Sequence, residues 1–144
     1  MREKLKVLIV EDVFLIQRML QKLILEYADC QSAENGKKAV ELYTSEYFNG
    51  EPFDVIFLDI FMPEMDGIEV LQSIRLFEDE LKMKPEEKIN IIMVTSMSNN
   101  NMIQKAKNLG CNGYITKPFS REQIISELKR LGLVKKAEGR FKTS

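Results

Sequence analysis

Short apolar runs alternate with longer amphipathic segments along most of this sequence, and this alternation constrains the fold more than any other feature. Two runs, Leu5–Val10 and Ile91–Val94, are almost continuously apolar, as expected of strands buried on both faces of a parallel sheet. We expect strands at Leu5–Val10, Cys30–Glu34, Val55–Leu58, Ile91–Val94 and Tyr114–Ile115, of which the second and last are the weaker candidates.

The segments between these runs carry apolar residues at helical spacing. They predict helices at Val13–Tyr27, Gly36–Phe48, Gly67–Leu81, Asn100–Leu109 and Arg121–Leu131. Ser120 is a good N-cap with Gln123 at the capping-box position, and Gly110 and Gly132 each follow a helix where a left-handed residue is favoured. This order predicts an α/β fold, a doubly wound (βα)5 flavodoxin-like parallel five-stranded sheet with strand order 2-1-3-4-5.

The length of 144 residues predicts one domain, which we assign to residues 1–131. Residues 132–144 contain Lys135, Lys136, Arg140 and Lys142 and are expected to form a basic, mobile C-terminal tail. Before the fourth strand, Met83–Asn90 contains Pro85 and several charged residues and is predicted to be a loop.

The composition excludes several classes of function. The sequence has no histidine, which excludes imidazole metal sites, Ser-His or Cys-His nucleophiles, and a phosphohistidine carried by this chain. A formal net charge of −1 gives no signature of nucleic-acid or membrane binding. Cys30 and Cys111 fit two reduced thiols rather than a disulfide framework. Without a signal peptide or a membrane-spanning run, we expect a soluble, cytoplasmic protein.

Acidic side chains follow two of the predicted strands. Glu11 and Asp12 come directly after the first strand, and Asp59 comes directly after the third. Ligands of open α/β sheets bind beyond the carboxyl ends of the strands, so these carboxylates converge if the first and third strands are neighbours. Three anions in one pocket repel each other, and a hard cation that prefers oxygen ligands, such as Mg²⁺, removes that repulsion.

Two further side chains suit phosphoryl chemistry. A carboxylate beside Mg²⁺ can act as a nucleophile toward a phosphoryl group and form an acyl phosphate. The phosphoryl oxygens then require donors and positive charge. Thr95, at the end of the fourth strand, offers a hydroxyl, and Lys117, after the fifth strand and before Pro118, offers an ammonium group.

Several motifs, each at the end of a predicted strand, resemble the receiver domain of bacterial response regulators over about residues 4–131. Each motif is weak alone, but their order along the chain is specific. They are Val10-Glu11-Asp12, Phe57-Leu58-Asp59 with Met62-Pro63 and Met65-Asp66-Gly67, Val94-Thr95-Ser96, and Tyr114-Ile115-Thr116-Lys117-Pro118-Phe119.

The resemblance implies a role for each site residue. Asp59 would accept a phosphoryl group from the phosphohistidine of a sensor histidine kinase or a histidine phosphotransfer protein. Asp12, Asp59, Glu11 and the backbone carbonyl of Phe61 would hold Mg²⁺. Thr95 and Lys117 would bind the phosphoryl group, and the Lys117–Pro118 bond is expected to be cis.

The same resemblance implies how the signal leaves the domain. Tyr114 would turn inward as Thr95 moves and change the surface formed by the last two helices and the fifth strand. A downstream protein target would bind that surface, as in single-domain regulators of the chemotaxis type. Such a domain catalyses only its own phosphorylation and dephosphorylation.

Other interpretations remain open at this stage. Asp12 would suit a helix cap, and Tyr114 would equally suit the core. The chain would also suit a phosphorelay intermediate, the receiver part of a longer DNA-binding regulator, or an adaptor that keeps only the fold. An aspartate-based phosphatase of the haloacid dehalogenase type is disfavoured because Phe61 stands where that chemistry expects a second aspartate.

Two features depart from the family pattern. Phe61 and Met97, two residues beyond Asp59 and Thr95, are apolar at positions that are often polar, and we expect them to obstruct water and prolong the lifetime of a phosphoryl group. The Phe77–Lys88 region is also longer than the usual connection and would extend the third helix or form a surface for a partner.

Overall fold

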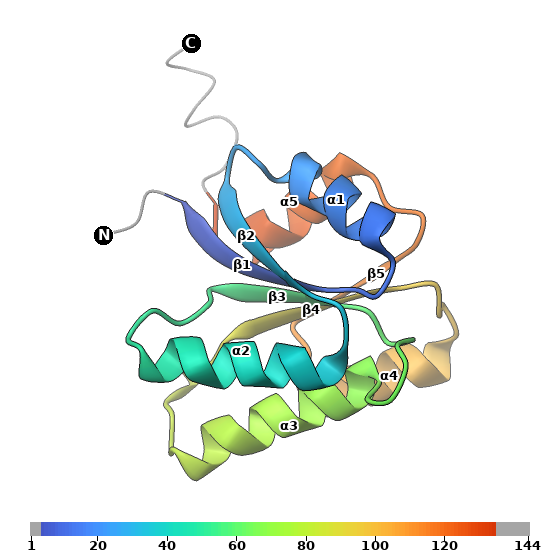
Figure 1. Cartoon of the computed structure of the whole chain (residues 1–144). Coiled ribbons are helices and arrows are strands. Elements are labelled where there is room, and N and C mark those ends of the chain that lie inside the picture. The colour runs from blue at the N-terminus through green and yellow to red at the C-terminus, as the bar shows by residue number, and fades with distance from the viewer. Residues whose placement is uncertain (1–3, 135–144) are drawn as a thin grey trace.

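The computed structural model describes residues 4–134 as a three-layered α/β fold (Figure 1). Its strands are β1 (Leu5–Val10), β2 (Ala28–Ala33), β3 (Val55–Leu58), β4 (Asn90–Thr95) and β5 (Gly113–Thr116). Its helices are α1 (Phe14–Leu23), α2 (Gly36–Phe48), α3 (Gly67–Glu80), α4 (Asn100–Asn108) and α5 (Arg121–Arg130). All strand pairs are parallel, in the order β2-β1-β3-β4-β5, which confirms the predicted sheet.

The sheet separates two apolar cores because alternate residues of a strand point to opposite faces. Leu8 and Val10 of β1 pack with residues of α2, α3 and α4, whereas Val7 and Ile9 pack with residues of α1 and α5. Figure 1 shows the same division, with α1 and α5 above the sheet and the other three helices below it. Burial on both faces explains why the central strands are almost continuously apolar.

The expected helix signals are present in the structure. Ser120 and Gln123 form a reciprocal capping box at the start of α5, and Asp66 and Glu69 form another at the start of α3. Gly110 follows α4 with a φ of +103°, a backbone conformation that glycine adopts at little cost. These residues fix where the helices begin and end.

Three predicted segments differ from the structure. The helix expected to reach Tyr27 ends at Leu23, and the second strand begins at Ala28 instead of Cys30. Tyr27 and Ala28 instead donate backbone hydrogen bonds to Ile24 in a tight turn that leads into β2. The predicted loop before β4 contains a short 3₁₀ helix, η1 (Pro85–Glu87).

The last described residues pack against the domain. Leu133 and Val134, within the segment expected to be a tail, are half-buried against the core that also contains α1 and α5. Residues 135–144, which hold the basic side chains of that segment, lie outside the described residues. Among the described residues, no helix combines the length and apolar character needed to cross a membrane.

Candidate functional site

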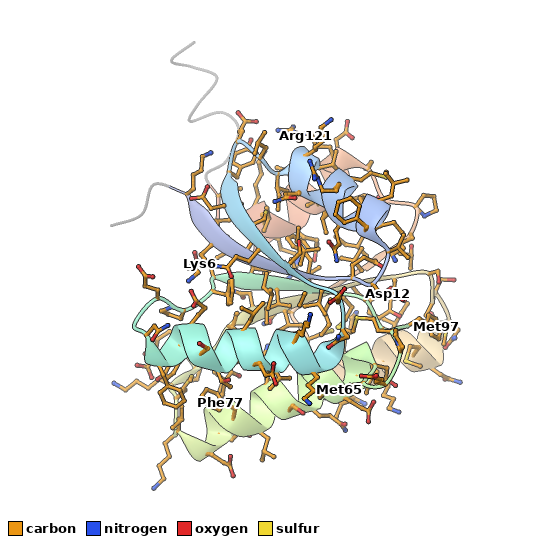
Figure 2. All side chains as sticks on the ribbon, in the orientation of Figure 1. Lys6, Asp12, Met65, Phe77, Met97 and Arg121 are labelled. Atoms are coloured by element: carbon orange, nitrogen blue, oxygen red, sulfur yellow. The ribbon has the colours of Figure 1, made fainter. Side chains whose placement is uncertain are left out.

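Three carboxylates meet at the C-terminal ends of the central strands. Val10 of β1 pairs with Leu58 of β3, so the residues that follow them, Glu11 and Asp59, emerge side by side. One oxygen each from Glu11, Asp12 and Asp59 lies within 4.8 Å of the others. Glu11 and Asp59 are buried, whereas Asp12 is exposed and lies at the same end of the molecule as Met97 (Figure 2). The predicted convergence of these three side chains is therefore present.

Lys117 reaches this cluster from the loop after β5. Its backbone N–H donates to the carbonyl of Thr95 at 2.8 Å, and its peptide bond to Pro118 is cis, as expected. Its Nζ lies 2.6 Å from Glu11 Oε1 and 3.2 Å from Asp59 Oδ2. The ammonium group thus bridges the two buried carboxylates, and this pairing with Glu11 is not apparent from the motifs.

The electrostatics of the pocket depend on burial and on this pairing. Burial raises the pKa of Glu11, with the charge of Asp59 acting in the same direction against the hydrogen bond from Lys117. Burial would lower the pKa of Lys117, but its hydrogen bond to Glu11 and the charge of Asp59 outweigh burial and raise it. Lys117 therefore stays protonated and compensates part of the negative charge.

Glu11, not Asp12, supports the start of α1. Glu11 Oε2 accepts a hydrogen bond from the backbone N–H of Val13 at 3.1 Å, and its carbonyl accepts from the side chain of the buried Gln17. Val13 occupies the N-cap position without a side-chain cap. The side chain of Asp12 is thus not used as a helix cap. Sequence reasoning missed the role of Gln17, which no motif marks.

Gly67 holds the loop after Asp59 close to the end of β3. Its N–H donates to the carbonyl of Ile60 at 2.8 Å, and a Cβ at this position would lie 2.1 Å from the carbonyl oxygen of Asp59. Any side chain here would displace the backbone of Asp59. The N–H of Phe61 lies 3.4 Å from Asp59 Oδ1, and Phe61 is 53% exposed.

Thr95 and Tyr114 are joined through Met97. Thr95 is fully buried, and its hydroxyl oxygen accepts a hydrogen bond from the N–H of Met97 at 3.4 Å. The hydroxyl of Tyr114 donates to the carbonyl of Met97 at 2.8 Å. Burial raises the pKa of Tyr114, with the charges of Cys111 and Asp59 acting in the same direction, so the hydroxyl stays protonated. A displacement of the loop after β4 would therefore act directly on the Tyr114 side chain.

The donor set of the carboxylate cluster fits a small hard cation. Three carboxylates, each with an oxygen within 4.8 Å of the others and one of them exposed, suit Mg²⁺, which binds few protein oxygens and keeps several waters. No sulfur or nitrogen ligand comes from these three residues, which argues against a soft transition metal.

Comparison with known proteins decides the family. The family model of the response regulator receiver domain matches residues 7–129. The chain belongs to this family. Its sheet order is thus that of a receiver domain, and the expected resemblance is confirmed.

Individual relatives agree with this assignment. Chemotaxis protein CheY of Halobacterium salinarum is 35% identical over 124 residues, which are 85% of this chain and 92% of that protein. CheY of Borrelia burgdorferi, solved in a complex with CheX, BeF₃ and Mg²⁺, is 28% identical with a TM-score of 0.75, covering 91% of this chain and 90% of that one. The probable histidine kinase 2 of rice is 33% identical over an alignment of 129 residues that covers 83% of this chain but 12% of the kinase.

The chain is accordingly a receiver domain of the CheY type, a response-regulator component of two-component systems. Such domains are signalling switches and not enzymes that turn over an external substrate.

Proposed function

We propose that this receiver domain is switched by phosphorylation of Asp59 and signals to a downstream protein by direct contact. The observation that carries the proposal is the bridge that Lys117 forms between Glu11 and Asp59, within a cluster that also contains Asp12. It brings to one point the carboxylate that would act as the nucleophile, the carboxylates that would bind a metal ion, and an ammonium group.

The phosphoryl donor in this proposal is the phosphohistidine of a sensor histidine kinase or a histidine phosphotransfer protein. Asp59 Oδ attacks the phosphorus, the bond to the histidine nitrogen breaks, and an acyl phosphate forms on Asp59. The absence of histidine from this chain requires the phosphohistidine to come from a partner. A cytoplasmic location, where such donors carry their phosphohistidine, is part of the proposal.

Asp12, Asp59, Glu11 and the carbonyl of Phe61 would hold Mg²⁺, which supplies positive charge to the transferring phosphoryl group. Lys117 is the second positive charge and would bind a phosphoryl oxygen after leaving Asp59 Oδ2. Thr95 would donate its hydroxyl to another phosphoryl oxygen, and its movement toward that oxygen would displace Met97, whose N–H donates to the Thr95 hydroxyl oxygen.

The output in this proposal is the surface of α4, β5 and α5. A movement of Thr95 changes the position of Met97, whose carbonyl holds the hydroxyl of Tyr114. Tyr114 lies on β5 and lines a groove of about 590 Å³ between α4 and α5, together with Ile103 and Gln123. The shape of this groove would then report the state of Asp59 to the target.

The test is the mass of the intact protein after incubation with Mg²⁺ and a small acyl phosphate, with Asp59→Asn as the matched variant. We expect one phosphoryl adduct on the wild type, none on the variant, and none when Mg²⁺ is removed with a chelator. The absence of an adduct on folded wild type, with a donor that labels another receiver domain, would favour an adaptor that keeps only the fold.

A further inference from the structure

Arg75 of α3 lies outside the pocket but binds the segment in which α4 ends and β5 begins. All five N–H groups of its guanidinium donate hydrogen bonds. Nε and Nη2 donate to the carbonyl of Gly110 at 3.1 and 2.8 Å, and Nη2 also donates to Asn112 Oδ1 at 2.8 Å. Nη1 donates to the carbonyl of Ile89 at 2.8 Å and to Glu78 Oε1 at 2.7 Å.

Glu78 holds the guanidinium in place. This carboxylate is fully buried, and its second oxygen accepts from the hydroxyl of Tyr43 at 3.2 Å and from the N–H of Ile89 at 2.7 Å. A buried carboxylate requires a compensating cation, so Arg75 cannot leave without a large free-energy penalty. The side chain is therefore a fixed anchor and not a mobile surface arginine.

The anchored segment connects several elements. Asn112 Oδ1 also accepts from the N–H of Ile91 on β4 at 2.7 Å, and its carbonyl accepts from Arg130 on α5. At Gly110 a Cβ would approach Arg75 Nε to 3.2 Å, and the φ of +103° disfavours any other residue. The far ends of α3, α4, β4 and α5 are thus joined at one point.

The body of α4, in contrast, is weakly held. Ala106 is its one buried residue, whereas α3 buries six, from Gly67 to Glu78. At the end near the pocket, the segment before α4 is held through the contacts of Met97 with Thr95 and Tyr114. Few buried apolar contacts mean a low local stability, so α4 can move more easily than α3.

We propose that Arg75 is a positioning residue that pins the C-terminal end of α4, so that α4 acts as a lever hinged at Gly110. This inference rests on the proposed function, since a phosphoryl group on Asp59 is what displaces the Met97 end. With one end fixed, the displacement becomes a rotation of α4 across the groove instead of a shift of the whole helix. The partner-binding surface then changes most near Asn100 and least near Gly110.

The experiment measures amide hydrogen exchange in the full chain and in two arginine-to-lysine variants. Arg75→Lys keeps a cation beside Glu78 but loses the planar fork that binds Gly110 and Asn112 together. The matched control is Arg121→Lys, which alters an arginine that contacts Glu26 and the carbonyl of Leu23, away from α4. Each variant is measured at rest and with beryllium fluoride plus Mg²⁺ as a phosphoryl mimic.

At rest, we expect the rate of amide exchange at residues 109–112 to rise about tenfold in Arg75→Lys, because about two hydrogen bonds are lost. The rate should stay unchanged in Arg121→Lys. With the phosphoryl mimic, the wild type should change at 97–103 and not at 110–112. In Arg75→Lys the change should spread to 110–112. If Arg75→Lys does not fold, Asn112→Ala removes the side-chain acceptor of Arg75 Nη2 and should give the same pattern.

Unchanged exchange at 109–112 in the resting variant would overturn the proposal, as would a wild-type response equally large at both ends of α4. Failure of the proposed function is detected separately. A wild type that forms no phosphoryl adduct by mass refutes phosphorylation of Asp59, and the resting comparison still decides whether Arg75 pins α4.

Discussion

Lys117 is the residue on which the charge balance of the pocket depends. It contacts Glu11 and Asp59, so it occupies oxygens that a metal ion would also bind. Lysine and Mg²⁺ would therefore compete in the unphosphorylated pocket, although the proposed function would need both once a phosphoryl group adds negative charge. A single ammonium group would thus weaken metal binding and promote phosphorylation.

Replacing Lys117 by methionine should therefore tighten Mg²⁺ binding while it impairs phosphorylation. We expect the affinity for Mg²⁺ to rise on the order of tenfold. An opposite charge in contact with a carboxylate stabilises the ionised form by a factor of about ten or more, and Mg²⁺ no longer has to displace that charge in the variant. Titration calorimetry with Mg²⁺ measures this change. Lys38→Met, which removes an exposed pair with Glu34, is the control and should bind Mg²⁺ like the wild type. Weaker binding by Lys117→Met would contradict the competition.

The apolar side chains beside the pocket give a second prediction at this scale. Phe61 is exposed next to Asp59, and Met97 is half-buried next to Thr95. If they obstruct the attacking water, the double variant Phe61→Asn/Met97→Gln should lose its phosphoryl group several-fold faster than the wild type. A time course of intact mass after donor removal measures the lifetime. Leu76→Gln, an exposed apolar position on α3, controls for the loss of surface apolarity, and an equal lifetime in all three proteins would refute the obstruction.

At the scale of elements, helix ends decide where the functional loops lie. The capping box of Ser120 and Gln123 starts α5 at Arg121, four residues after Lys117, so it fixes the length of the loop that carries the lysine. The N-cap Asn99, whose side chain accepts from the N–H of Met102, starts α4 in the same way after Met97. Local hydrogen bonds thus set the position of both loops at the pocket.

Removal of the cap at Ser120 should destabilise the domain. Ser120→Ala is expected to lower the free energy of unfolding by about 1 kcal/mol, since the N–H of Gln123 loses its acceptor. Urea denaturation measures the change. Ser126→Ala, at an exposed position inside the same helix, should cost little, and an equal loss in the two variants would show that the cap contributes nothing specific.

Sequence patterns predicted the elements well where burial is symmetrical and poorly at the edge of the sheet. β1 and β3 match their expected bounds because most of their length is buried on both faces and every residue except Lys6 is apolar. β2 is an edge strand with exposed Asp29, Gln31 and Ser32, so its pattern gave little signal. The first helix ends at Leu23 although Ile24 and Tyr27 keep helical spacing. The turn after the helix still places both side chains in the core, so their burial does not require the helix to continue.

The candidate site was predictable as far as strand ends determine it. The convergence of Glu11, Asp12 and Asp59 follows from two neighbouring parallel strands. Lys117 Nζ lies closer to Glu11 than to Asp59, and this difference depends on loop geometry that no motif specifies. The network of Arg75 had no signal either, since its acceptors are mostly backbone carbonyls and lie far from it in the sequence.

At the scale of the whole molecule, one sheet supports two cores. Ile74 of α3 is fully buried on one face and Ile124 of α5 on the other. Both helices pack on the same strands, so neither core can form without the sheet that the other also covers. The described chain should therefore behave as one cooperative unit.

Truncation of either isoleucine tests this cooperativity. Ile74→Ala and Ile124→Ala should each lower the free energy of unfolding by about 2–5 kcal/mol through lost burial and the cavity left behind. In both variants, circular dichroism and tyrosine fluorescence should report the same denaturation midpoint. Separate midpoints in one variant, with one face unfolding first, would contradict a single unit.

The two ends of the described chain lie near the N-terminal end of β1, as Figure 1 shows, and Leu5, Leu133 and Val134 share one core. The carboxylate pocket lies at the opposite, C-terminal ends of the strands. A polypeptide attached to either end would therefore leave the pocket open to a partner. The fold can therefore be joined to other domains without blocking the pocket. This is a steric reason why a similar sequence can form a small part of a kinase many times its length.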